Sequence, residues 1–336
     1  MTARTTQTGE LSVEPLDQRA EYLPDLAFHA STALPAGRQT LALTVGGIGV
    51  RLSGLTSGQR ATLEERYGIF CADGGAAPAL TLEITNVQRD GFLKVARPSE
   101  YYRVETRWEG EVLLACSYEW AGWLDRSRGR GGLALARVTE EDPRAFDRSM
   151  ENFLRIVYAH AVIPSGGFLL HSAGLVRDGR AYLFFGPSGS GKTTVTTLSP
   201  EALVLSDDLT MILRSGTGEY RACSVPFRGL FAPRPESDES WPVAGFFRLI
   251  QASEDRLEPV RGARAIGELV GSLPFVTERS EIAGDVIDTI AAAASRVPVF
   301  RLHFRKDRTF WRLIEATGGQ APILPPVDGF STAGGN

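Results

Sequence analysis

Nine consecutive residues, GPSGSGKTT, have the types and the spacing needed to hold a phosphate group. They match the pattern G-x-x-x-x-G-K-[ST] at every position, in which glycines let the backbone curl so that its N–H groups face an anion. The lysine adds a mobile positive charge for the outer phosphates, and the threonine after it offers a hydroxyl for Mg²⁺. The predicted nucleotide-binding residues are Gly186, Pro187, Ser188, Gly189, Ser190, Gly191, Lys192, Thr193 and Thr194.

The segments on both sides of this loop fit the structural context that the motif requires. Tyr182 to Phe185 form an apolar run that indicates a strand entering the loop, and Thr194 to Leu198 can begin a helix behind it. The alternative is a Gly/Ser-rich turn that binds nothing, and the strand before it and the helix after it argue against that alternative.

The preceding strand is predicted to run antiparallel to the loop strand. Gly167 to Val176 read as a strand, and Arg177-Asp178-Gly179-Arg180 separate it from the strand that enters the loop. An Asp-Gly turn joins antiparallel neighbours, whereas a parallel connection needs a crossover of about a dozen residues or more. In most phosphate-loop NTPases the loop strand lies in a parallel sheet instead.

Two adjacent carboxylates follow the loop at short range. Leu203 to Ser206 read as an apolar strand that ends in Asp207 and Asp208, and Asp207 lies fifteen positions after Lys192. Phosphoryl transfer needs a metal that bridges the outer phosphates and a group that deprotonates the acceptor. We expect one aspartate to support the metal and the other to accept the proton. The alternative is that the pair caps a helix or forms a turn.

The four histidines fall into two groups. His171 lies in the strand paired with the loop strand, where it could donate a hydrogen bond to an outer phosphate; the alternative is a buried structural histidine. His29, His160 and His303 have no such context, and we interpret them as structural.

The order of these motifs resembles a known family of kinases. LLHSAGLVRDGRAYLFFGPSGSGKTT followed by LSDDLTMI is similar to the catalytic core of the HPr kinase/phosphorylase group, more closely to its HPr-kinase-related branch and more distantly to phosphoenolpyruvate carboxykinases. The similarity covers about residues 167–231, with a weaker stretch near 298–311. It implies ATP and Mg²⁺, with Lys192 and His171 in the catalytic site, Asp207 as base, and Thr193 and Asp208 as metal partners.

The resemblance also implies a substrate and identifies one departure. Related kinases occur near genes for modified peptides, which suggests a Ser or Thr hydroxyl of a protein or peptide as acceptor. In the family stretch similar to Phe227–Leu230, a metal-supporting Glu precedes the Arg by two residues, and here that place is Pro226. The second metal contact and reverse phosphorolysis are therefore not implied for this chain. Arg228, Arg261 or Arg264 could supply a cation at the transferring phosphate, or be surface residues.

Composition limits the remaining function classes. The net charge of −4, without a basic stripe, argues against nucleic-acid binding. Three widely spaced cysteines, Cys71, Cys116 and Cys223, indicate neither a disulfide framework nor a zinc site. No signal peptide and no apolar run of about 18 residues is recognisable, so we expect a cytoplasmic protein without a membrane partner.

The first half of the chain has a different pattern from the second. Short alternating runs between Gln39 and Val138 predict antiparallel hairpins, interrupted by a helix at Gly58–Tyr67. Trp108, Trp120 and Trp123 either cover the core, which we favour, or bind a peptide at a sheet edge. Helical spacing over Pro143–Val162 predicts an amphipathic helix between the halves.

The predicted fold class is α/β, with a β-rich α+β N-terminal domain and a C-terminal phosphate-loop domain with a mixed sheet, similar to HPr kinase and phosphoenolpyruvate carboxykinase. The predicted boundaries are a disordered tail at 1–11, the N-terminal domain at 12–141, the bridging helix at 142–164, the kinase domain at 165–326 and a disordered tail at 327–336.

Three hypotheses stay open: a protein or peptide kinase, a small-metabolite kinase, and a nucleotide-binding switch that transfers nothing. The sequence does not indicate an oligomeric state.

Overall fold

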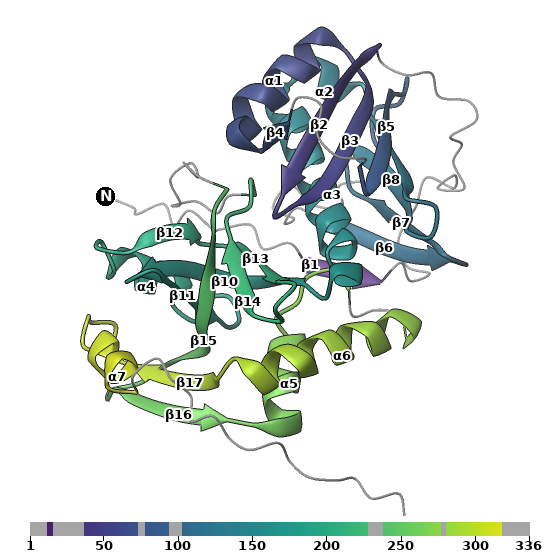
Figure 1. Cartoon of the computed structure of the whole chain (residues 1–336). Helices are drawn as coiled ribbons and strands as arrows, with labels where there is room; N and C mark the ends of the chain where they lie inside the picture. The colour runs from purple at the N-terminus through teal and green to yellow at the C-terminus, as the bar shows by residue number, and fades with distance from the viewer. Residues whose placement is uncertain are drawn as a thin grey trace, which may run out of the picture.

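The computed structural model describes residues 12–15, 37–72, 78–93, 103–227, 238–276 and 280–317. It is a mixed α/β structure with two mixed sheets, one built from each half of the chain (Figure 1). The two predicted tails, 1–11 and 327–336, lie outside the described residues, as does His29.

The N-terminal sheet has nine strands in the order β1-β6-β7-β8-β9-β5-β3-β2-β4. Its strands are β1 (Ser12–Pro15), β2 (Gln39–Val45), β3 (Ile48–Leu55), β4 (Cys71–Ala72), β5 (Leu80–Asn86), β6 (Arg103–Glu109), β7 (Val112–Cys116), β8 (Trp120–Asp125) and β9 (Arg130–Leu135). The predicted antiparallel hairpins are confirmed for β2–β3 and for the run β6 to β9. The prediction was wrong for β5, which is parallel to both of its neighbours. A helix separates β3 from β5, and such a crossover is what a parallel pair requires.

Three α-helices belong to this half of the chain: α1 (Ser57–Tyr67), α2 (Val138–Glu141) and α3 (Pro143–Ala161). The Thr56 hydroxyl and the Gln59 side chain form a reciprocal capping box at the start of α1. The Asp142 side chain accepts from the Arg144 N–H, and Pro143 occupies the first turn of α3, where its missing N–H costs nothing. Helix α1 is followed by a 3₁₀ turn at Gly68–Phe70, and α3 is followed by another at Ile163–Ser165.

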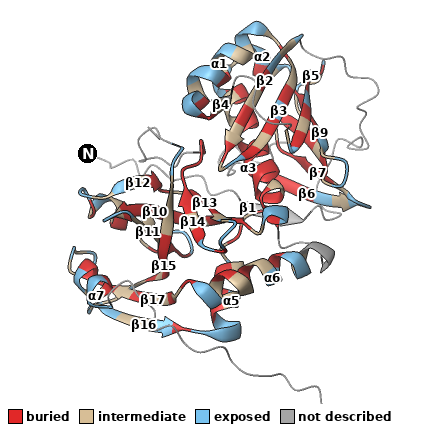
Figure 2. Cartoon of the chain, in the orientation of Figure 1, coloured by how far each residue is buried: buried red, intermediate tan, exposed pale blue. Residues whose placement is uncertain are grey.

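Helix α3 forms as predicted, but it is buried on more than one face (Figure 2). From Ser149 to His160 every residue is buried, including polar Glu151, Asn152 and Arg155. Phe153 packs against Trp120 of the N-terminal sheet, and Tyr158 packs against Phe227 of the second half. The helix therefore lies inside a core shared by both halves, which also explains why Trp120 is a core residue.

The β2–β3 hairpin contacts the second half directly. It also contacts α3, where the Tyr158 hydroxyl donates to the Leu43 carbonyl at 3.3 Å. At Gly46, φ is +57°, and a Cβ there would lie 2.8 Å from atoms of Met211 and Leu213. The positive φ favours glycine at this turn, and a larger residue would require the Met211 and Leu213 side chains to move.

The C-terminal sheet has eight strands, and most of them follow the path β11-β10-β13-β14-β15-β17-β16. Its strands are β10 (Phe168–Arg177), β11 (Arg180–Phe185), β12 (Leu203–Ser206), β13 (Leu209–Arg214), β14 (Tyr220–Cys223), β15 (Ser240–Gln251), β16 (Arg256–Val260) and β17 (Val299–Phe304). The predicted antiparallel pairing of β10 with β11 is confirmed, and β12 also pairs with β10. On its other side β11 is parallel to β15, which is in turn parallel to β17.

Helices cover the two faces of this sheet. They are α4 (Lys192–Thr197), α5 (Gly262–Val270), α6 (Ser280–Arg296) and α7 (Phe310–Ala316). One face of β11, β15 and β17 packs with α4 and α7 in an aromatic cluster that contains Phe184, Phe247 and Trp311. The other face joins the core shared with the N-terminal sheet, together with residues of α5 and α6. Strand β11 thus ends between two packed layers, and the phosphate loop begins there.

Candidate active site

The phosphate loop leaves β11 at Gly186 and enters α4 at Lys192. Gly186, Gly189 and Gly191 all have positive φ, which glycine adopts without steric cost. A Cβ at Gly191 would lie 2.6 Å from the Phe304 ring, so the loop is seated on the end of β17. The glycines of the motif therefore adopt backbone conformations that other residues rarely reach, and their role in holding an anion stays a prediction.

The side chains of the loop fit a bound phosphate group. The Lys192 ammonium donates to the Gly186 carbonyl at 2.8 Å and to the Pro187 carbonyl at 3.4 Å, so it lies across the loop. The Ser190 hydroxyl is buried and has no hydrogen-bond partner among the described residues. An orphaned donor beside a lysine is the arrangement that an anion would satisfy.

The Mg²⁺ prediction rests on Thr193 and on the acidic pair. Thr193 is half-buried in the first turn of α4, one residue after Lys192. Within the described ranges, no group of three or more His, Cys, Asp and Glu side chains is arranged to hold a metal ion. Mg²⁺ in nucleotide sites is held by one or two protein oxygens together with phosphates and water, so the residues present fit that kind of site.

The two aspartates lie between β12 and β13 and differ in their surroundings. Asp207 is buried, with 6% of its surface exposed, whereas the side chain of Asp208 is 25% exposed. Asp208 Oδ2 lies 3.0 Å from Arg155 and Oδ1 lies 3.2 Å from His171 Nε2. Burial alone would raise the pKa of Asp208, but Arg155, His171 and Lys192 together hold it well below its ordinary value.

Arg155 belongs to a buried chain of charges along α3. Besides Asp208, its guanidinium contacts Glu151 at 2.6 Å, and Glu151 also pairs with Arg66 of α1. Arg66 lies 3.3 Å from Asp147. Since Arg155 is only 8% exposed, its charge requires these partners inside the protein. Sequence analysis missed Arg155, because its role depends on a partner 53 positions away.

The structure brings His171 to the acidic pair. It lies near the end of the β10–β11 pairing, where Ser172 is opposite Phe185, and its side chain contacts Asp208. The predicted structural role of His160 is confirmed. It is fully buried, one ring nitrogen lies 2.9 Å from the Phe275 carbonyl, and burial lowers its pKa to about 3.

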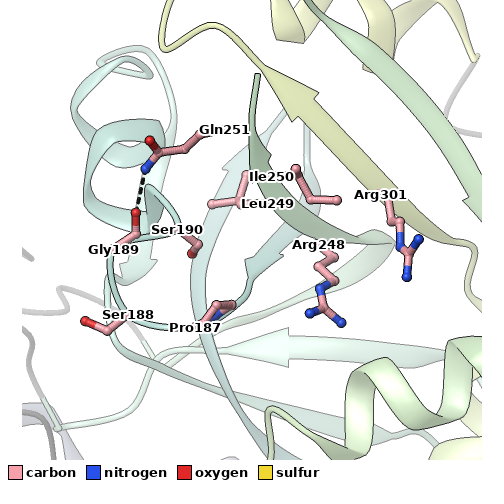
Figure 3. Close-up of a pocket in the computed structure, with 9 residues that line it drawn as sticks. All are labelled: Pro187, Ser188, Gly189, Ser190, Arg248, Leu249, Ile250, Gln251 and Arg301. Carbon is pink, nitrogen blue, oxygen red and sulfur yellow. Dashed lines mark hydrogen bonds between the residues drawn. The ribbon is translucent and has the colours of Figure 1, made fainter. Parts of the chain in front are cut away.

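A basic group lies on the opposite side of the loop. Arg248 of β15 is in register with Phe185, and Arg301 of β17 is in register with Arg248. With loop residues 187–190 and Gln251 they line a pocket of about 450 Å³ (Figure 3). Arg264 of α5 approaches the same group, whereas Arg261 precedes that helix and Arg228 lies outside the described residues. In β17, the polar residues Arg301 and His303 alternate with the apolar residues Phe300, Leu302 and Phe304. This alternation in the sequence indicates a strand with one polar face.

The comparison with protein families identifies a relationship for the second half of the chain. A family model described as SynChlorMet cassette protein ScmC matches residues 137–317, which is more than half of the sequence. The chain belongs to the ScmC family. The ScmC match begins just before α3 and includes the phosphate loop, both aspartates and the basic group. The comparison with curated proteins gives no match.

The ScmC match does not test the resemblance to HPr kinases, because the matching family model is a different one. That resemblance therefore stays a prediction, and so do the roles of the individual site residues. In the part of the chain that the structure describes, no helix combines the length and the apolar composition needed to cross a membrane.

Proposed function

We propose that this protein is an ATP-dependent kinase, similar to HPr kinases, that transfers the γ-phosphoryl group to a Ser or Thr hydroxyl of a protein or peptide. The observation that carries the proposal is the meeting of three elements at one edge of the C-terminal sheet. These are the loop with Lys192 across it, the acidic pair after β12, and His171 of β10. The proposal includes a cytoplasmic location, which the separated cysteines favour.

The residues divide the work of phosphoryl transfer between them. Lys192, the Ser190 hydroxyl and the loop N–H groups hold the outer phosphates and stabilise their charge. Thr193 and Asp208 would hold Mg²⁺, which when bound supplies positive charge between the outer phosphates. Asp207 accepts the proton of the acceptor hydroxyl. Arg155 and His171 orient Asp208 through the contacts described above.

A nucleotide-binding switch is the second candidate, and one observation favours it. Asp208 is already engaged by a guanidinium and a histidine, so its charge is balanced without a metal ion. A protein that only senses ATP needs no acceptor base, and such a balanced carboxylate would suit it. The kinase is preferred because a second carboxylate, Asp207, lies beside it and has no use in a sensor.

The test begins with nucleotide binding and continues to transfer. In calorimetry, Lys192→Ala should weaken binding of Mg²⁺–ATP by about tenfold or more, because a charged hydrogen bond of ~1.5–3 kcal/mol is lost. Lys306→Ala, at a surface lysine with positive φ outside the site, is the matched control and should bind normally. Equal affinities for the wild type and Lys192→Ala would remove the loop assignment.

Transfer is then measured with radiolabelled ATP against small proteins and peptides encoded beside the gene. Labelling of a Ser or Thr that depends on Lys192 supports the kinase. Tight ATP binding without labelling of any of these acceptors would favour the switch.

A further inference from the structure

Three arginines, two of which line the pocket of Figure 3, converge on a single carboxylate. Glu268 of α5 is 7% exposed, and its Oε1 lies 2.7 Å from Arg301 Nε. The same oxygen lies 3.9 Å from Arg248 and 3.8 Å from Arg264. Its other oxygen is buried and accepts no hydrogen bond from the described residues.

The group therefore has more positive than negative charge. Three guanidinium groups share one carboxylate, and only Arg301 is within hydrogen-bonding distance of it. Glu268 fixes Arg301 in place, while Arg248 and Arg264 approach it at distances that leave their hydrogen-bonding edges available to a ligand. The side chains of Arg248 and Arg301 are 35% and 22% exposed, so they are partly desolvated but reachable.

The excess charge lies on the strands next to the phosphate loop. Neighbouring strands lie about 4.8 Å apart, so the register places Arg248 one spacing and Arg301 two spacings, roughly 10 Å, from Phe185 at the start of the loop. Figure 3 shows both guanidinium groups on the same face of the strands. Gln251 donates to the Gly189 carbonyl at 2.5 Å, which fixes the loop to β15 and forms the wall of the pocket between them.

This pocket is separate from the acidic side of the loop. Its lining contains loop residues 187–190 but not Lys192, His171, Asp207 or Asp208. The pocket shares loop residues 187–190 with the predicted nucleotide site, but Lys192 donates to the Gly186 and Pro187 carbonyls, and the arginines come from β15 and β17, on the side of β11 away from β10. The planar guanidinium fork binds carboxylate and phosphate groups in a bidentate manner, so two such forks suit an oxyanion, and a pocket of this size has room for the rest of the molecule that carries it.

We propose that Arg248 and Arg301 form an oxyanion subsite for the acceptor, which would carry a carboxylate or phosphate group in addition to its hydroxyl. The inference rests on the proposed kinase function and refines its substrate class. Because β15 and β10 lie on opposite sides of β11, the acceptor must extend across the loop, with its hydroxyl on the acidic side and its anion on the basic side.

The experiment uses inorganic phosphate as probe and the full chain saturated with Mg²⁺ and a non-hydrolysable ATP analogue, so that the loop is occupied. Calorimetry should show phosphate binding to the wild type, and Arg248→Gln and Arg301→Gln should each weaken it at least tenfold. Affinity for the ATP analogue should stay within about threefold in both variants. A parallel titration with succinate tests whether the subsite takes carboxylates.

The control is Arg312→Gln, at an exposed arginine of α7 that lies outside the pocket lining. It should bind phosphate like the wild type. Arg301→Gln removes the partner of a buried carboxylate and can unfold the protein. Arg248 is more exposed than Arg301, so Arg248→Gln is the deciding variant. Arg248→Lys, which keeps the charge without the fork, should restore part of the affinity.

Two results would overturn the inference. One is that the wild type binds neither phosphate nor succinate, or binds them equally well after Arg248→Gln. The other is that Arg248→Gln weakens the ATP analogue as much as it weakens phosphate, since the arginine would then belong to the nucleotide site. If the wild type binds no ATP analogue, the kinase proposal fails instead, and phosphate titrated into the nucleotide-free protein with Lys192→Ala as reference still tests the pocket.

Discussion

The two sides of the phosphate loop carry opposite charges, and they are neutralised to different extents. On the acidic side, Asp208 lies between Arg155 and His171, and Arg155 is balanced again by Glu151. On the basic side, three arginines share one glutamate. The acidic side is thus internally balanced and positioned, whereas the basic side has charge left for a ligand.

Each side receives its counter-charge from a helix outside the strands that form it. Helix α3 supplies Arg155 to the acidic side, and α5 supplies Glu268 to the basic side. Burial accounts for the difference: Arg155 is nearly inaccessible, so leaving it without partners would be costly, while the half-exposed Arg248 and Arg264 are stabilised partly by water. Changes on the acidic side should therefore affect rate and stability, and changes on the basic side should affect binding.

The largest expected effect is on the rate of transfer. Asp207→Asn keeps the shape of the side chain but removes the base, so transfer should fall by ~10²–10⁴ while Mg²⁺–ATP binds within a few-fold. Single-turnover transfer and calorimetry measure the two quantities. Arg248→Gln should instead raise the KM for the acceptor and leave the single-turnover rate at saturation nearly unchanged. A rate loss in Asp208→Asn but not in Asp207→Asn would exchange the two roles.

The next effect is on stability. Arg155→Met leaves buried Glu151 and partly buried Asp208 without their shared cation, so we expect a loss of ~3–5 kcal/mol in the free energy of unfolding. Arg264→Met removes a guanidinium that is 59% exposed and 3.8 Å from Glu268, and it should cost less than ~1 kcal/mol. Urea denaturation compares the two variants. Similar losses in both would contradict the difference in burial between the two sides.

Thr193 is a proposed ligand of Mg²⁺, so the effect of removing its hydroxyl on ATP affinity should depend on the metal ion. Thr193→Ala should weaken ATP binding by about tenfold in the presence of Mg²⁺, corresponding to ~1.4 kcal/mol, and have little effect in its absence. Calorimetric titrations with Mg²⁺ and with EDTA measure this. Equal losses under both conditions would show that the hydroxyl contacts the nucleotide or the loop and not the metal.

The smallest effect is a change in the pH dependence of stability. The pKa of Asp208 is lowered in the folded protein, so its ion pairs stabilise the fold above the ordinary Asp range and are lost as the pH falls from about 4 toward the folded value. Asp208→Asn should therefore be less stable than the wild type at pH 7 by an amount that is constant down to about pH 5 and shrinks below pH 4. Urea denaturation at each pH measures it, and a constant difference down to pH 3 would show that the pKa is not lowered.

Local patterns predicted the acidic side well. The loop, the Asp-Gly hairpin and the strand ending in Asp207 and Asp208 lie within about 40 residues, and turn chemistry fixes their pairing. The same kind of argument located α3, because its apolar residues follow a helical period. It did not show that α3 is buried on several faces, since burial of Glu151 and Arg155 depends on partners from other elements.

The basic side could not be predicted in the same way. Arg248 and Arg301 come together through the parallel register of β15 with β17, and about 50 residues separate these arginines in the sequence. Glu268 joins them only because α5 packs on that face. Periodicity within one segment contains no information about such a register. For the same reason the parallel pairings of β5 were missed, while the local hairpins around it were found.

The contact of the Gly46 turn with the second sheet bears on whether the segment matched by the family model could be combined with a different first half. The family match begins at residue 137, yet α3 packs in a core shared with the N-terminal strands, and a methyl group at Gly46 would require the Met211 and Leu213 side chains to move. The matched segment is therefore not an exchangeable module. A chimera that kept residues 137–317 and replaced the first half would have to supply apolar side chains that complete this shared core.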